Sequence, residues 1–217
     1  MTNKYAVLRI EKIKSVSSTG ARLRHIRRVI PCPTATPNVK NIRVVMNEQM
    51  KEDKNKPFKE IFKERVGDQK IRKNAIISVE VVLTFSPDAV HPDKYKEWVK
   101  ENAEWLKTTF GEKNIVECIA HRDEKTFHIH CQMILCDEKG KLNTRKFIGG
   151  HRNRMSELQT SYAKQMEKFG LERGVSRKIT KKKHESSLRW HAMQAEKEER
   201  LKRYEKTYGR DSLKEDR

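Results

Sequence analysis

Apolar and polar residues alternate along parts of the chain with the period of two that is typical of strands. The segments that show this pattern, or that are rich in β-branched residues, are 4–14, 39–46, 75–85, 114–121 and 126–136. Only a short polar stretch separates the last two, which favours an antiparallel hairpin. Because a hairpin cannot belong to a purely parallel sheet, we expect an antiparallel one.

Helices are predicted between these strands from apolar residues that recur every three or four positions. The segments with this pattern, or with helix-boundary signals, are 21–30, 57–66, 91–110 and 152–169. Pro57 suits the first turn of its helix, and Gly111 and Gly170 suit the ends of theirs. Residues 15–20 are small and polar, which favours a flexible break. Together these elements predict an α+β fold, with a central antiparallel β-sheet and helices packed on one face.

The composition indicates a binding partner and a domain boundary. The chain has 217 residues, of which 35% are hydrophobic and 36% charged, and 49 Lys and Arg against 30 Asp and Glu leave a net charge of +19. Such a charge indicates a polyanionic partner, with nucleic acid favoured over an anionic membrane surface. From residue 180 large apolar residues become rare, so we expect a folded domain over 1–180 and a basic helical C-terminal extension over 181–217.

No apolar run in the chain is long enough for the core of a signal peptide or for a membrane-spanning helix. We therefore expect a cytoplasmic protein. The four cysteines lack the spacing of a zinc site, and in that compartment they are expected to be small buried thiols.

Three histidines are the strongest candidates for chemistry. His128 and His130 are two residues apart in a predicted strand, so their side chains point to the same face. His121 ends the preceding strand and reaches the same point if the two strands form a hairpin. Three converging imidazoles bind a metal and leave coordination positions open for a substrate. Asp123 and Glu124 are either further ligands or acceptors that orient the imidazoles, and the second role is favoured for Glu124.

A metal held by neutral imidazoles in a basic domain suggests phosphodiester chemistry, in which the metal is a Lewis acid on a phosphate oxygen. Nitrogen ligands favour Mn²⁺ or another transition metal over Mg²⁺, which is the second option. The nucleophile stays open at this point: an activated water, a serine, a tyrosine or His25. Its neighbours Arg24, Arg27 and Arg28 would lower the proton affinity of His25 and hold a phosphate beside it. If His25 is not the nucleophile, it belongs to a helix that only binds the DNA backbone.

These motifs resemble a known family. The segment His121-x-Asp-Glu-x-Thr-x-His-x-His resembles the third motif of MobV-type plasmid mobilisation relaxases (the Mob/Pre family), a branch of the HUH endonucleases. The run from His25 to Arg28 is similar to the family's first motif, and Asn41 to the asparagine of its second. Segments 72–75 and 169–174 also match in the same order, so the resemblance spans residues 4–190.

The sequence departs from the family pattern at three places. Ile26 and Arg27 replace the usual polar pair of the first motif. Phe127 stands where the third motif has a proline. Residues 41–44 lack the tyrosine and the acidic residue of the second motif. These departures fall beside the histidines and in a predicted strand, so we expect them to change the surroundings of the site.

The resemblance implies an HUH, or palm-like, fold and a specific activity. Relaxases of this type bind an origin of transfer, as a hairpin with adjacent single strand, nick one strand by transesterification and stay attached to its 5′ end. The metal ligands would be His121, His128 and His130. His25 would be the nucleophile, in place of the tyrosine of most relaxases. Glu124 would support the site, and Arg28 would position the scissile phosphate.

Basic and polar residues around these motifs are the predicted DNA contacts: Arg22, Arg24, Arg27, Asn41, Arg72, Lys73, Lys181, Lys182 and Lys183. The family also implies other mobilisation or transfer proteins as partners, and a homodimer through the C-terminal helix. Two other functions stay open on the same scaffold. One is a regulator that binds origin or hairpin DNA without cutting it. The other is a rolling-circle replication initiator with a tyrosine nucleophile, for which Tyr162 is the candidate.

Overall fold

The computed structural model describes residues 4–44 and 46–175, and in addition 179, 189, 192–193, 195–196, 199–200 and 202–204. The chain divides into two units, Met1–Gly174 and Val175–Arg217. The described residues of the second unit from 179 onward are helical.

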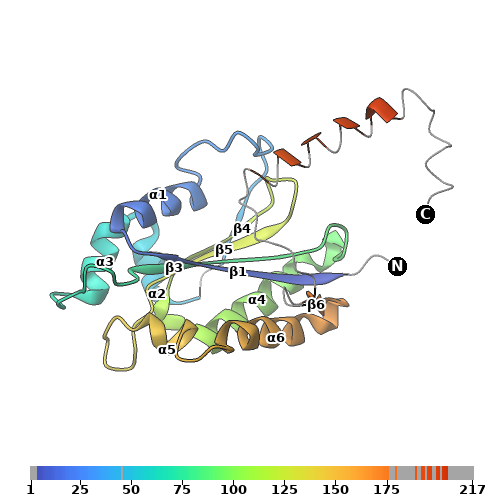
Figure 1. The fold of residues 1–217 in the computed structure, drawn as a ribbon. Coiled ribbons are helices and arrows are strands. Elements are labelled where there is room, and N and C mark those ends of the chain that lie inside the picture. Colours follow the sequence, from blue (N-terminus) through green and yellow to red (C-terminus); the bar gives the residue numbers. More distant parts are fainter. Residues whose placement is uncertain are drawn as a thin grey trace. The chain divides into compact units, whose positions relative to one another are not determined.

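Six strands form one sheet in the order β2-β4-β5-β3-β1-β6 (Figure 1). Their bounds are β1 Tyr5–Ile13, β2 Ile42–Arg43, β3 Ser78–Phe85, β4 Ile115–His121, β5 His128–Met133 and β6 Glu172–Arg173. All neighbouring pairs are antiparallel except β1 and β6. The predicted antiparallel sheet is confirmed. The strand expected over 39–46 is reduced to β2, which pairs with β4 over two residues at the sheet edge.

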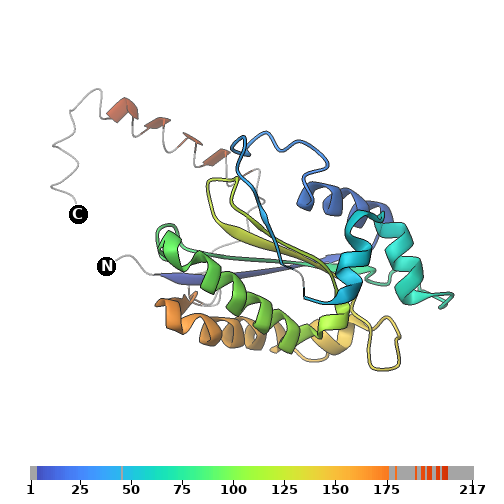
Figure 2. The same cartoon turned by 180° about the vertical axis from the view of Figure 1, so that it is seen from behind.

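Helices α4 (Tyr95–Phe110) and α6 (Arg154–Met166) lie side by side over one face of the sheet (Figures 1 and 2). Their apolar stripes meet those of the strands in a core that includes Val81, Leu83 and Ile129, all without exposed surface. Burial of these side chains is the main force that holds the layers together. Phe127 joins this core, where its ring stacks on Tyr95 with centroids 4.2 Å apart. The family's proline is thus replaced by an apolar anchor for the turn before β5.

Helices α1 (Val16–Ile26) and α3 (Phe58–Val66) pack on the opposite face (Figure 1). A second apolar cluster, with Leu23 and Ile61 at its centre, joins them to the sheet. The α+β class and the helices on one face are as predicted, and these two helices cover part of the other face. The flexible break expected at 15–20 is wrong, because the Ser15 hydroxyl accepts from the Ser18 amide and starts α1 there.

The remaining elements are short: α2 Glu48–Glu52, α5 Thr144–Ile148, and the 3-10 turns η1 Asp53–Asn55, η2 Pro92–Lys94, η3 Glu112–Asn114 and η4 Glu167–Phe169. None of them was predicted as a separate element, because pieces of one turn carry little periodic signal. Among the described residues, no helix combines the length and the apolar character that crossing a bilayer requires.

Tyr162 lies at the centre of the α4–α6 layer. It has no exposed surface, and its hydroxyl donates to Asn102 Oδ1 at 3.0 Å. Burial raises the pKa of the Tyr162 phenol above its ordinary value. Since the ring is sealed into the core on the face away from the histidines, Tyr162 has no path to a substrate in this structure.

Replacing Tyr162 with phenylalanine should lower the free energy of unfolding by about 1–3 kcal/mol, because the buried Asn102 oxygen loses its donor. Urea unfolding followed by circular dichroism measures the loss. Tyr95→Phe is the control, since that ring is only partly buried and contributes mainly its stacking face. Equal losses for the two variants would contradict the role given to the Tyr162 hydroxyl.

Candidate metal centre

Three imidazoles meet at the end of the β4–β5 hairpin. His121 pairs with His128 across the two strands, and His130 lies two residues further along β5. The ring centroids are 4.8 to 5.1 Å apart. One nitrogen of each ring lies within 4.8 Å of the others. The predicted convergence of the three rings is therefore present in the structure.

The second nitrogen of each ring donates to a fixed acceptor. His121 Nε2 donates to the Ile26 carbonyl at 2.9 Å, and His128 Nδ1 to the Thr126 carbonyl at 2.7 Å. His130 Nδ1 donates to Glu80 Oε1 at 2.6 Å. These bonds set the tautomers, so His121 Nδ1, His128 Nε2 and His130 Nε2 are the nitrogens turned to the common centre. His121 Nδ1 also accepts there from Arg28 Nη2 at 3.1 Å. Such a nitrogen set fits a transition metal.

Burial keeps two of the three imidazoles in the neutral form, which can bind a cation. Desolvation lowers the pKa of His121 to about 3, although its bond to the Ile26 carbonyl acts in the other direction. Desolvation also lowers the pKa of His128, helped by His130. Both rings are therefore neutral at pH 7, which is the form that binds a metal.

Glu80 is a site residue that the sequence analysis missed. It lies on β3 and shares a face with His130, because Val82 pairs with His130 and Glu80 with Gln132. Burial alone would raise the pKa of Glu80, but the bonds from His130 and Arg22 outweigh it and the net shift is downward. The sequence signal for Glu80 was a single acidic residue inside an otherwise apolar strand. Its partner, His130, could not be identified from this signal, because the pairing depends on the order of the strands in the sheet.

Arg28 reaches the centre from a strained turn. Helix α1 ends where the Arg28 amide bonds to the His25 carbonyl and the Val29 amide to the Arg24 carbonyl. This pair of backbone hydrogen bonds needs a residue with left-handed backbone conformation, which is usually glycine. Here that residue is Arg28, with φ +56°. Strain of this kind is typical of functional sites. The turn directs the guanidinium of Arg28 back toward His25 and the β4–β5 hairpin.

Two carboxylates hold the Arg28 guanidinium. It donates to both oxygens of Asp123 at 2.8 and 2.9 Å and contacts Glu124. These bonds lower the pKa of Asp123 and raise that of Arg28. The Asn41 amide also donates to Asp123, at 2.9 Å. Glu124 Oε1 lies 3.7 Å from His121 Nδ1, so this carboxylate borders the metal-binding centre. Arg28 thus binds two carboxylates, so fewer of its N–H donors are available for a phosphate than the sequence suggested.

His25 faces the three rings from the last turn of α1. Its ring centroid is 6.3 Å from that of His121 and 6.2 Å from that of His130. Arg28 Nη1 lies 3.3 Å from His25 Nε2 and, as a donor, requires a lone pair there. Burial, followed by the charge of Arg28, lowers the pKa of His25. His25 is thus a neutral imidazole whose ring lies beside the three histidines and whose Nε2 accepts from Arg28.

The predicted DNA contacts divide into two groups. Arg24, Arg72 and Lys73 are exposed. Arg27 is instead bound inside the protein: its Nε donates to Glu117 at 2.7 Å and only 10% of its side chain is exposed. Arg22 likewise bridges Glu11 and Glu80, and Asn41 accepts from the Arg122 amide while it holds Asp123.

Arg22, Arg27 and Asn41 are therefore held by partners within the protein, and their contact with DNA stays a prediction. Sequence alone shows the basic residues but not the acidic residues that the sheet places opposite them. Lys181, Lys182 and Lys183 lie outside the described residues.

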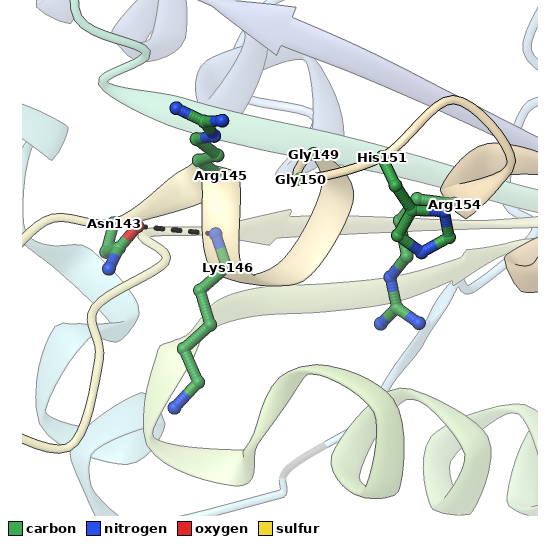
Figure 3. Close-up of a pocket in the computed structure, with 7 residues that line it drawn as sticks. All are labelled: Asn143, Arg145, Lys146, Gly149, Gly150, His151 and Arg154. Carbon is green, nitrogen blue, oxygen red and sulfur yellow. Dashed lines mark hydrogen bonds between the residues drawn. The ribbon is translucent and has the colours of Figure 1, made fainter.

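A second group of basic residues surrounds a hollow of about 510 Å³ at the turn between α5 and α6 (Figure 3). Figure 3 shows that Arg145 and Lys146 extend in opposite directions. His151 Nε2 and Arg154 Nη1 lie 3.3 and 3.9 Å from Glu157, which partly offsets their charge. The cationic groups do not converge, so we assign no ligand to this hollow.

Comparison with known proteins adds a family match. A family model described as plasmid recombination enzyme (Mob_Pre) matches residues 2–192. A 65 kDa protein of Zymomonas mobilis is 33% identical over 181 residues, which cover 79% of this chain and 30% of that protein. Plasmid recombination enzyme type 3 of Staphylococcus aureus is 25% identical over 191 residues, covering 83% of this chain and 46% of the relative. The chain thus spans about a third to a half of the length of these curated relatives.

Solved structures show the same fold. The MobM relaxase domain bound to oriT DNA of plasmid pMV158, in an Mn-bound crystal structure, matches with a TM-score of 0.72 and 22% identity. The match covers 88% of this chain and 98% of that domain. A further MobM structure, with DNA that carries a 3′ thiophosphate, matches with a TM-score of 0.70 and 21% identity.

Proposed function

This chain belongs to the Mob/Pre family of plasmid recombination enzymes, and we propose that it is a metal-dependent relaxase. It would nick one strand of an origin of transfer on a plasmid or mobile element and stay covalently attached to the 5′ end. The observation that carries this proposal is the convergence of one ring nitrogen each from His121, His128 and His130 next to the neutral His25. The Mn-bound, oriT-bound MobM domain of the same fold supports it.

His121, His128 and His130 would hold the metal, for which we propose Mn²⁺. Glu124 borders the same centre and would support the ligands. When bound, the metal supplies a Lewis acid for a non-bridging oxygen of the scissile phosphate. The donor set fits this ion, because each ring donates its other nitrogen to a fixed acceptor and turns the remaining nitrogen to the common centre.

His25 would be the nucleophile. Its Nε2 attacks phosphorus, a nitrogen–phosphorus bond forms, and the bond from phosphorus to the 3′ oxygen breaks. The proton that the imidazole loses balances the one that the new 3′ hydroxyl gains. Because the phosphoryl link is retained on the protein, the strand can later be rejoined. The lowered pKa of His25 favours this role, since only a neutral ring can attack.

Arg28, Asp123 and Asn41 would form the support of this centre. Arg28 touches His25, His121 and both carboxylates, so it would set the distance between the nucleophile and the metal ligands. Its positive charge, reduced by the two bound carboxylates, would also stabilise negative charge that develops on a phosphate beside His25.

The exposed basic residues would bind the DNA backbone. Arg24, Arg72 and Lys73 are the described residues that we propose for this contact, and the net charge of +19 favours it. Affinity should fall steeply with salt, since counterions are released from the phosphates. The basic extension over 181–217, its contribution to a homodimer and contacts with other mobilisation proteins remain predictions.

A supercoiled plasmid that carries the DNA flanking the gene for this chain tests the proposal. Incubation with protein and Mn²⁺ should yield open circles with protein on a 5′ end, and EDTA should prevent this. Retardation of the same plasmid without any nicked product would contradict the relaxase proposal and favour the non-cleaving regulator.

Replacing Glu80 with glutamine should weaken Mn²⁺ binding by about tenfold or more, because His130 loses the charged acceptor that fixes its tautomer. Isothermal titration with MnCl₂ measures the change. Glu11→Gln is the matched control: Glu11 is the other carboxylate on Arg22, but it does not touch His130. If both variants lost affinity equally, Glu80 would act only through Arg22.

A further inference from the structure

Helix α1 is followed by an arginine whose side chain points back into the protein. Arg27 lies between α1 and the left-handed Arg28, and its amide donates to the Leu23 carbonyl at 2.9 Å. Only 10% of its side chain is exposed. It comes two residues after His25 in the chain, so a force on Arg27 is transmitted to the turn that carries the His25 ring.

The Arg27 guanidinium makes three hydrogen bonds to groups outside α1. Nε donates to Glu117 Oε2 at 2.7 Å, Nη1 to the Lys56 carbonyl at 2.8 Å and Nη2 to the Asp53 carbonyl at 2.8 Å. None of these acceptors belongs to the histidine centre. A planar guanidinium held at all three nitrogens is fixed in both position and orientation. Arg27 therefore ties the end of α1 to β4 and to the segment 53–56.

Glu117 connects Arg27 to the strand of a proposed metal ligand. Glu117 and His121 are four residues apart in β4, so their side chains lie on the same face of the sheet. Glu117 has no exposed surface, and the same oxygen accepts from Arg43 of β2 at 2.9 Å. His121 also donates to the Ile26 carbonyl. The end of α1 is thus joined to β4 at two neighbouring residues, and only the Arg27 link leaves the metal ligands untouched.

These contacts suit a role in geometry better than a role in stability alone. A buried ion pair adds little net stability, because the cost of desolvating both charges offsets their attraction. The geometry it fixes has a larger effect, since a misplacement of about 1 Å at a reacting group can lower a rate about a hundredfold.

We propose that Arg27 is a positioning residue, which holds His25 at the distance from the metal ligands where its imidazole can attack a bound phosphate. This inference rests on the proposed function, because it takes His25 as the nucleophile. Arg27 is one of the two residues at which the chain departs from the family's first motif, so that motif assigns it no such role.

Arg27→Lys tests this proposal, because lysine keeps the charge but cannot replace a fork of three donor nitrogens. The supercoiled plasmid described above is mixed with Mn²⁺ and excess protein, and the rate of nicking is measured against protein concentration. The rate at saturation should fall about tenfold or more. The protein concentration at half-saturation should change by less than about twofold, since Arg27 is expected to act on the chemical step and not on binding.

Arg65→Lys is the matched control. The Arg65 side chain is 12% exposed, and its guanidinium also donates to one carboxylate, Asp53, and to two carbonyls, those of Lys113 and Ile115. None of these acceptors belongs to α1. Arg65→Lys is therefore expected to lower the melting temperature by an amount similar to Arg27→Lys, but to keep the nicking rate at saturation.

A second variant keeps the test decisive if Arg27→Lys does not fold. Glu117→Gln changes one acceptor and leaves Arg27 in place, so the rate at saturation should fall by a smaller factor, because both carbonyl bonds remain. Thermal unfolding and titration with MnCl₂ check that each variant is folded and binds the ion.

Three outcomes would overturn the inference and leave the relaxase proposal standing. The first is an unchanged rate at saturation in the folded Arg27→Lys variant, or in Glu117→Gln where only that variant folds. The second is weaker DNA binding with an unchanged rate at saturation, which would make Arg27 a DNA contact. The third is an equal loss of rate in the Arg27 and Arg65 variants, which would make its role purely structural. A wild-type chain that does not nick the plasmid would contradict the proposed function itself.

Discussion

The His25→Ala variant is expected to lose the covalent protein–DNA adduct, with the nicking rate lowered more than about a thousandfold. Alanine removes the only ring nitrogen that faces the metal ligands from α1 among the described residues. Binding to the same DNA should change little, because the exposed basic residues and the three ligand histidines remain. The measurement is a labelled-DNA adduct assay on denaturing gels, paired with a binding titration.

The chemistry of the adduct distinguishes the possible nucleophiles. A phosphorus–nitrogen link to histidine is broken by mild acid, whereas a link to tyrosine survives it. Tyr162→Phe is the matched variant, and it should keep the adduct, since Tyr162 has no exposed surface. An acid-stable adduct, or one that persists in His25→Ala, would show that another side chain attacks the phosphate.

The second large effect is expected at the proposed metal ligands. His128→Ala should abolish stabilisation by Mn²⁺, because two imidazoles bind the ion far more weakly than three. For the unaltered chain, Mn²⁺ at a hundred times its dissociation constant should add about 2.7 kcal/mol to the free energy of unfolding. In a chain of this size that raises the melting temperature by about 5–10 °C. Thermal unfolding with and without MnCl₂ measures the difference.

His91→Ala is the control for this experiment. The His91 side chain is 74% exposed, beside an exposed Asp93, so its loss should leave the Mn²⁺ response intact. His128 is suited to the test because, apart from its contact with Glu124, its hydrogen bond goes to the carbonyl of its own turn. An unchanged Mn²⁺ response in His128→Ala would place the ion elsewhere.

Local patterns were enough to predict that the three histidines converge. The spacing of His128 and His130 places both rings on one face of any strand, and the short polar stretch after His121 implies a hairpin. The long amphipathic helices α4 and α6 were also predictable from their apolar stripes. These features depend on residues close in sequence, so periodicity alone carries the information.

The surroundings of the centre depend on contacts between residues distant in sequence. Glu80 becomes the partner of His130 only because β3 lies beside β5. Arg22 and Arg27 form ion pairs within the protein because Glu80 and Glu117 lie on the face of the sheet that α1 covers. A charge pattern along the chain cannot separate these arginines from the exposed Arg24. Their roles are decided by which strand, in which register, lies opposite.

The residues alone therefore determine that three imidazoles share one face of a hairpin, because strand geometry leaves no other arrangement. Only the folded sheet decides which nitrogen of each ring is free, through acceptors at Ile26, Thr126 and Glu80. It also decides that His25 meets them, because the left-handed Arg28 ends α1 at that point. Periodicity assigns side chains to faces, whereas strand order and backbone turns assign them to partners.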